Sequence, residues 1–273
     1  MNWSVIARKE FRDVRRSKTL WTLFGVVSLV LAVPILTQSG SPQQADLTPL
    51  EAALSSLVTL GTLLFPIAVL VTSYDAVTGE LESGSATFLL GLPNTRLEAI
   101  VGKFVGRTAV TALGFGAAFA IGGVLLLVKF GSVPVATYVA VTALTLYFAA
   151  VWTAIGIGIS ALTGSRGRSL ASALGAYLFF VLGWIILLQP RKLAAQIVES
   201  MFGLSAMPQL YDFVFRLSPT TAYAFASNGL ISGGSETRPF FLQEWFMIIV
   251  LLLWLLGPIT LGYLRFRTSE LAR

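Results

Sequence analysis

The sequence predicts an all-α integral membrane protein with six transmembrane helices that follow an amphipathic N-terminal helix. Of its 273 residues, 55% are hydrophobic and only 12% are charged, whereas about 25% of residues are charged in an average soluble protein. The mean hydropathy is +0.80. Six apolar stretches reach or approach the roughly 20 residues that a helix needs to cross a bilayer. None of them has Asp, Glu, Lys or Arg in its middle.

The composition also excludes several kinds of chemistry. The chain has no cysteine and no histidine, which removes disulfides, Cys/His zinc sites and every Ser-His or Cys-His catalytic pair. It has no Gly-x-x-x-x-Gly-Lys-Ser/Thr motif, so it is not expected to bind ATP through a P-loop. We therefore expect no catalytic residue, no metal site and no cofactor in this chain. The net charge of +6 does not predict nucleic-acid binding, because in a membrane protein the position of the charges matters more than their sum.

The first element, residues 1–19, has the pattern of an amphipathic helix at the membrane surface. Its apolar residues recur at the spacing of one helical face, and its basic residues cover the rest. Such a helix lies in the interface with its basic face toward anionic headgroups. Two interpretations remain open: a plain positive-inside anchor, or an elbow helix that also touches a cytoplasmic partner. The apolar residues are Trp3, Ile6, Ala7, Phe11 and Val14, and the basic ones are Arg8, Lys9, Arg12, Arg15 and Arg16.

The six spans occupy a transmembrane domain over residues 20–264, which residues 265–273 follow as a cytoplasmic tail. The first and fifth stretches are short for a span, so their ends are the least defined. Small residues in the third span, such as Gly102, Gly106 and Gly114, allow close helix approach. We expect them to pack within one subunit rather than to form a dimer seam. The predicted spans are Leu20–Leu36, Leu54–Tyr74, Phe104–Val128, Val135–Leu162, Leu170–Leu188 and Phe240–Leu264.

The basic residues set the orientation of these spans. Of the 19 Lys and Arg residues, 14 lie in the termini and in the loops on the same side, and 5 lie on the other side. Since cytoplasmic loops carry the excess of positive charge, both termini are expected in the cytoplasm. An even number of spans agrees with this. We expect a multi-pass protein of the cell membrane.

The cytoplasmic loop 75–103 is the most informative segment outside the spans. Ser83 or Ser85 is placed to cap a short helix, and Gly91 and Pro93 would end it. Apolar residues in that helix would be exposed unless a partner covers them. The alternative is a solvated loop that only connects two spans. The apolar residues are Phe88, Leu89 and Leu92.

The extracellular segment 189–239 is the longest predicted segment outside the membrane. It contains two amphipathic helical patterns, and Ser218-Pro219 reads as an N-cap followed by proline at the first helical position. Helices this apolar are expected to lie against the membrane or to re-enter it. The segment is either an ordered connector or an outer lid over a transport path.

The loop after the second span also carries a family resemblance. It reads Glu-x-Glu-Ser-Gly-Ser…Leu-x-Leu-Pro-x-x-Arg…Gly-Lys over Gly79–Lys103. With six spans and the N-terminal helix, this resembles the membrane subunit of an ATP-binding cassette exporter of type 2, the ABC-2 permease family. The resemblance implies two permease subunits, which we expect to be identical, in the lipid bilayer with two separate ATPase subunits that bind ATP and Mg²⁺.

The resemblance also implies that this loop supplies a coupling helix that docks on the ATPase. Glu80 and Glu82 are expected to pair with basic groups on the ATPase or on the N-terminal helix, and Phe88 and Leu89 to be the apolar anchors. The residues that the resemblance assigns to coupling are Glu80, Glu82, Ser83, Gly84, Ser85, Thr87, Phe88, Leu89 and Pro93.

The sequence thus favours a non-catalytic permease subunit of an ATP-driven exporter. The uncharged spans fit a lipophilic or amphipathic cargo, such as a lipid, a hydrophobic drug or a small peptide. An ATP-independent secondary carrier or channel is a first alternative, although ion-driven carriers usually keep an ionisable residue in the membrane. A membrane scaffold that transports nothing is the second alternative. The substrate-binding residues are not identified by the sequence.

Overall fold

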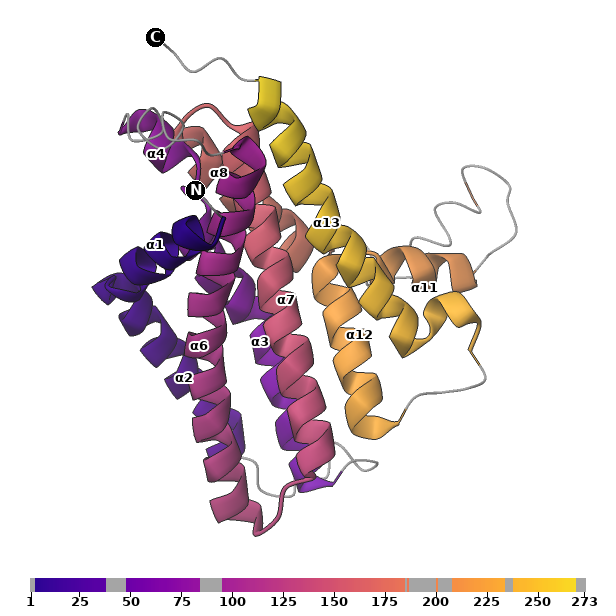
Figure 1. Cartoon of the computed structure of the whole chain (residues 1–273). Helices are drawn as coiled ribbons and strands as arrows, with labels where there is room; N and C mark the ends of the chain where they lie inside the picture. The colour runs from indigo at the N-terminus through magenta and orange to yellow at the C-terminus, as the bar shows by residue number, and fades with distance from the viewer. Residues whose placement is uncertain are drawn as a thin grey trace.

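The computed structural model describes residues 3–37, 48–83, 95–184, 208–233 and 238–268, together with Ile186 and Ser200. This part of the chain is helical and contains no strand. The long helices form a bundle, and α1 and the C-terminal end of α13 lie toward the same end of it (Figure 1). In order, the elements are α1 (Trp3–Arg15), α2 (Lys18–Thr37), α3 (Pro49–Ser73), α4 (Thr78–Glu82), α6 (Arg96–Phe130), α7 (Val135–Leu162), α8 (Arg166–Tyr177), the π-helix η2 (Leu178–Gly183), α11 (Pro208–Arg216), α12 (Pro219–Ser232), the 3-10 turn η3 (Phe240–Leu242) and α13 (Glu244–Thr268).

Four helical segments are long and apolar enough to cross a membrane. They are Pro49–Glu82, Arg96–Phe130, Val135–Leu162 and Glu244–Thr268. In the first predicted span, α2 has a shorter apolar part, Phe24–Thr37. The fifth predicted span begins in α8 and continues in the π-helix η2 rather than as one regular helix. The chain therefore has four apolar spanning candidates among the described residues, and the first and fifth spans stay predictions.

The helices α3 and α6 begin earlier than the hydropathy of the chain predicts. Each follows a capping box, in which a threonine side chain accepts a hydrogen bond from the N3 amide and the N3 glutamate accepts one from the threonine amide. Thr48 and Glu51 form this box before α3, and Thr95 and Glu98 form it before α6. The last residues of the predicted loop 75–103 are consequently the first turns of α6.

The helix α12 starts where the sequence predicts it, but it lies deeper than an external segment would. The Ser218 side chain accepts a hydrogen bond from the Thr220 amide at 3.3 Å, with Pro219 at the first helical position. The helix packs against α13, α3 and α7. Its Tyr223 is fully buried and stacks on Phe148 of α7, with the ring centroids 4.2 Å apart. Part of the predicted outer segment therefore belongs to the core, while residues 189–199 and 201–207 lie outside the described part of the chain.

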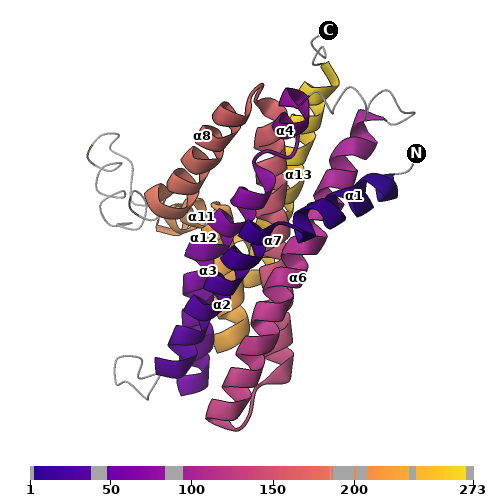
Figure 2. The ribbon, with the colours of Figure 1, turned by 90° about the vertical axis from the view of Figure 1, so that its left-hand side faces the viewer.

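The helix α1 lies across the bundle rather than along it, as Figure 2 shows. It rests on α6, where a Cβ at Gly102 would lie 2.6 Å from the Ile6 Cβ and a Cβ at Gly106 would lie 2.6 Å from the Ala7 carbonyl oxygen. These glycines pack within one chain, as predicted. Two residues of the predicted apolar face of α1, Ile6 and Ala7, are buried on protein, whereas Trp3 of the same face is exposed. The predicted basic residues Arg8, Lys9, Arg12, Arg15 and Arg16 are exposed.

Candidate functional site

Seven charged side chains form a continuous network at the end of the bundle where α1, the corner between α3 and α4, α6 and α8 meet. Cations and anions alternate along it, and each carboxylate contacts two cations. Buried charges are tolerated when each one has such partners. This ion network consists, in order, of Lys9, Glu80, Lys103, Glu10, Arg107, Asp75 and Arg166.

The centre of the ion network is buried. Lys103 is 2% exposed, and its Nζ lies 2.9 Å from Glu10 Oε1 and 2.8 Å from Glu80 Oε2. The other Glu10 oxygen accepts from Arg107 Nε at 3.0 Å. A single ammonium on α6 thus joins α1 to α4. Removing one partner would leave a buried charge without compensation.

The two ends of the ion network reach the surface. Lys9 Nζ lies 3.0 Å from Glu80 Oε1. At the other end, Asp75 Oδ1 lies 3.2 Å from a guanidinium nitrogen of Arg107, and Asp75 Oδ2 lies 2.5 Å from one of Arg166. Since Asp75 belongs to the corner after α3, the guanidinium of Arg166 brings α8 into the same network.

The electrostatics of the ion network favour the charged forms of Glu10 and Lys9. Burial by itself would raise the pKa of Glu10, but the Lys103 ammonium and the Arg107 guanidinium lower it below the usual value. Burial would lower the pKa of Lys9, yet the hydrogen bond and the charge of Glu80 raise it. Both shifts favour the charged forms that the ion network needs.

Two serine hydroxyl groups fix the corner between α3 and α4. Ser160 Oγ, buried on α7, accepts hydrogen bonds from the amides of Val77 at 3.0 Å and Thr78 at 3.1 Å. Ser169 of α8 donates to the Tyr74 carbonyl. Because the first amides of a helix have no partner within it, Ser160 supplies what α4 lacks. The corner is therefore attached to α7 and α8 as well as to α1 and α6.

An open polar cavity of about 600 Å³ lies beside the ion network. Six of the seven network side chains, all but Lys103, line it, and Asp13, Ser17, Thr72 and Gly79 are among its other lining residues. The cavity separates part of α1 from the corner between α3 and α4. Within the described residues, no group of three or more Asp and Glu side chains is placed to hold a metal ion.

A further contact connects the start of α6 with the end of α13. The Arg96 guanidinium donates to the carbonyls of Phe266 and, at 3.2 Å, of Arg267, and it lies 5.3 Å from the centre of the Phe266 ring. The last carbonyls of a helix need such external donors. Arg96, the first residue of α6, therefore holds the last turn of α13.

Three of the nine predicted coupling residues lie in the described part of the chain. Glu80 contacts Lys9 of α1, which is one of the two partners expected for it. Glu82 accepts a hydrogen bond from the Arg166 amide at 2.7 Å, and Ser83 is the C-cap of α4. The other predicted residues, Gly84, Ser85, Thr87, Phe88, Leu89 and Pro93, lie outside the described residues.

Most members of the ion network were missed by sequence reasoning. Glu10, Asp75, Lys103, Arg107 and Arg166 were absent from the predicted site. One signal was present for Glu10: it falls on the apolar face of the N-terminal helix, where an acid needs a buried cation. No local pattern shows that this cation is Lys103, which is 93 residues away.

Comparisons with known proteins show the family of this chain. The family model described as ABC-2 family transporter protein matches residues 4–271. The chain is 32% identical over 226 residues to the probable ABC transporter permease protein NosY of Pseudomonas aeruginosa, which covers 80% of this chain and 78% of that protein. It is 31% identical over 239 residues to the protein of the same name from Stutzerimonas stutzeri, with 84% and 83% covered. The chain belongs to the ABC-2 transporter family.

Proposed function

We propose that this member of the ABC-2 family is the membrane permease subunit of an ATP-driven exporter. Both named relatives carry the description of an ABC transporter permease. In this proposal the chain forms the substrate path and hydrolyses no ATP, and a separate ATPase subunit binds ATP and Mg²⁺. The ATPase docks on the loop 75–103.

The ion network is the observation that carries this proposal. A loop that transmits force must be attached firmly to several helices, and Glu80 and Asp75 attach the start of this loop to α1, α6 and α8. Ser160 adds α7. A push on the loop would then move these helices together as one body, in the manner of rigid-body transitions.

The placement in the membrane follows from the same end of the molecule. The ion network and the exposed basic face of α1 lie at the end that we assign to the cytoplasm, because basic residues concentrate there. In this assignment α1 is the elbow helix, α2 is the first span, and α8 with η2 forms the fifth. The chain is then a six-span protein of the cell membrane with both termini inside.

The cargo and the second permease are the finer parts of the proposal. The spans of α3 and α7 have no Asp, Glu, Lys or Arg between Leu54 and Tyr74 or within Val135–Leu162, which supports a lipophilic or amphipathic cargo such as a lipid, a hydrophobic drug or a small peptide. A second copy of this chain is the expected partner in the membrane. The two copies would enclose the path between them.

Co-expression with the ATPase encoded beside this chain tests the proposal. Leu89→Asp should abolish co-purification of the ATPase, because it places a charge in the expected docking helix. Glu80→Gln should keep co-purification but lower ATP-dependent transport of lipophilic dyes and labelled phospholipids into inside-out vesicles at least about tenfold. Arg238→Gln, which breaks an exposed 3.4 Å ion pair with Glu244 remote from the loop, is the matched control and should change neither.

Three outcomes would contradict the proposal. Wild-type behaviour of both loop variants would remove the coupling role of the loop. Transport by the purified chain without nucleotide would identify a secondary carrier or channel. Stable ATPase binding without movement of any cargo would identify a scaffold.

A further inference from the structure

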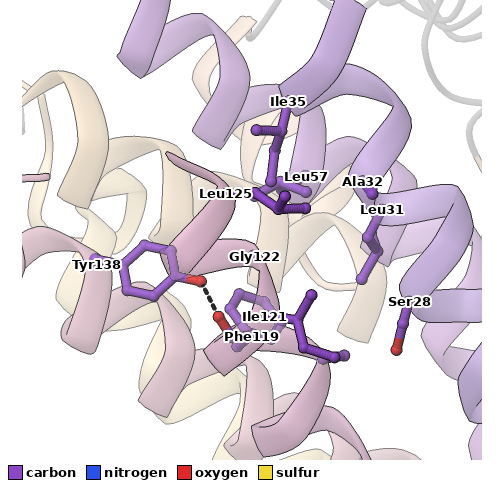
Figure 3. A pocket seen from close by; sticks show the side chains of 11 residues that line it. Ser28, Leu31, Ala32, Ile35, Leu57, Phe119, Ile121, Gly122, Leu125 and Tyr138 are labelled. Carbon is purple, nitrogen blue, oxygen red and sulfur yellow. Dashed lines mark hydrogen bonds between the residues drawn. The ribbon is translucent and has the colours of Figure 1, made fainter. Parts of the chain in front are cut away.

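A narrow apolar groove lies between α2 and α6 in the half of the bundle away from the ion network (Figure 3). One wall comes from α2 and the other from α6, while Leu57 of α3 and Tyr138 of α7 also line it. The wall residues that matter below are Ser28, Ala32 and Ile35 of α2 and Gly122 and Leu125 of α6. The groove takes no part in the ion network or its polar cavity.

The shape of the groove suits a slender apolar occupant. It encloses about 10 Å³, which is the space of a single water, within an open hollow of about 280 Å³. The two side-chain hydroxyls of the lining are already paired: Tyr138 donates to the Phe119 carbonyl (Figure 3), and Ser28 donates to the Phe24 carbonyl at 2.7 Å. Gly122 keeps the groove open, since even a Cβ there would lie 3.3 Å from the Tyr138 hydroxyl oxygen and 3.7 Å from Ile35 Cδ1. A polymethylene chain fits such a slot better than a ring does.

A cation stands where the groove ends. Lys129 follows Leu125 by one helical turn on α6, and its Nζ donates to the carbonyls of Ile35 at 2.6 Å and Leu36 at 2.7 Å. Ile35 itself lines the groove. An ammonium has three N–H donors, so one remains beyond the two that these carbonyls accept. The side of the groove is apolar and its end is positively charged and exposed.

We propose that this groove binds one acyl chain of a phospholipid whose phosphate pairs with Lys129. Charge complementarity selects the occupant. A phospholipid has a slender apolar chain followed by an anionic group, and the protein presents an apolar groove followed by the Lys129 cation. The lipid fills the space between α2 and α6 and belongs to the leaflet opposite the ion network. The inference needs only that α2 and α6 lie in a bilayer, so it stands or falls separately from coupling to an ATPase.

Lipid retention tests the proposal. The full chain is reconstituted in vesicles of equal parts phosphatidylglycerol and phosphatidylcholine, extracted again in mild detergent, and analysed by native mass spectrometry. Wild-type protein should retain one phosphatidylglycerol per chain. Gly122→Leu should retain at least about fivefold less, because its side chain fills the groove. Gly116→Leu is the matched control on the same helix, where a Cβ meets nothing within 4 Å, and it should retain lipid as the wild type does.

Two further variants make the test independent of one substitution. Ala32→Leu narrows the groove from the α2 wall and should reduce retention in the same way, which keeps the test open if Gly122→Leu fails to fold. Lys129→Gln preserves hydrogen-bond donors toward α2 and should retain lipid without preference for phosphatidylglycerol over phosphatidylcholine. Equal loss in Gly116→Leu, or no retained lipid in the wild type, would overturn the proposal. So would a change of oligomeric state in Gly122→Leu with lipid retention unaltered, since a second copy would then occupy the groove.

Discussion

The ion network and the contact between α7 and α12 both bury polar side chains, but they satisfy them differently. In the ion network each carboxylate contacts two cations. Between α7 and α12, which we call the seam, the hydroxyls of Thr145 and Tyr223 lie 2.7 Å apart, and Tyr223 stacks on Phe148. Among the other buried polar atoms of these helices, Trp152 Nε1 and Thr220 Oγ1 have no hydrogen-bond partner within the described residues.

This difference separates two ways of holding helices together. Charge pairing fixes which atoms meet. The helices of the ion network therefore cannot shift without leaving a buried charge unpaired in a low-dielectric environment. The seam is held mainly by the shape of its rings, and its unpaired hydroxyl and indole N–H already carry a desolvation cost of about 1–3 kcal/mol each. The first region suits the transmission of force, and the second suits adjustment between helices.

The largest expected effect is the loss of a central charge in the ion network. Glu10→Leu leaves Lys103 and Arg107 without their shared carboxylate, and we expect the free energy of unfolding to fall by about 3–5 kcal/mol. Unfolding in mixed micelles of dodecyl maltoside and SDS measures it. Arg238→Gln breaks a far more exposed pair and should cost no more than about 1 kcal/mol. Equal effects of the two substitutions would show that burial adds nothing to the ion network.

Two neighbouring threonines of α12 test how hydrogen bonding of a buried hydroxyl affects stability at the seam. Thr220→Val removes a buried hydroxyl that has no partner, so it should raise the free energy of unfolding by about 1 kcal/mol. Thr221→Val removes a hydroxyl that donates to the Phe215 carbonyl at 2.6 Å, and it should lower the free energy by about 1 kcal/mol. The same micelle titration gives both values. A loss of stability in Thr220→Val would mean that its hydroxyl is satisfied.

The smallest expected effect is the response of the two regions to acid. The pKa of Glu10 in the folded protein lies below its usual value of 4.5. Its contribution to stability is therefore fully present above pH 4.5 and is lost as the pH falls through the lower, folded pKa. The difference in unfolding free energy between wild type and Glu10→Gln should shrink below that pH, whereas the effect of Thr220→Val should stay constant. A difference that grows on acidification would contradict the assignment.

Local signals predicted much of the helical framework. The apolar run Val135–Leu162 coincides with α7, and Ser218-Pro219 marks the start of α12. The early starts of α3 and α6 were missed because hydropathy stops at charged residues, although Thr48-x-x-Glu51 and Thr95-x-x-Glu98 are visible capping signals. The shift from a regular to a π-helix at Leu178 had no such signal.

The site was harder to predict than the fold because it consists of long-range contacts. Glu80 was selected as a coupling residue, whereas its partner Lys103, which ends the same motif, was given no role at the site. Gly102 and Gly106 were noted as small, but only the structure shows that α1 crosses there and delivers Glu10 to Lys103. Pairings across 93 residues depend on how helices cross, which a single sequence does not encode locally.

The hydrogen bonds from Arg96 to the carbonyls of Phe266 and Arg267 have a practical consequence. Arg96, the first residue of α6, holds the end of α13. If an ATPase docks on the loop 75–103 as proposed, a label at the end of α13 should move when the ATPase binds. The chain contains no native thiol, and a single cysteine introduced at Thr268 would accept a spin label without competing sites. Distances measured from that position would report nucleotide-driven motion at the end of α13.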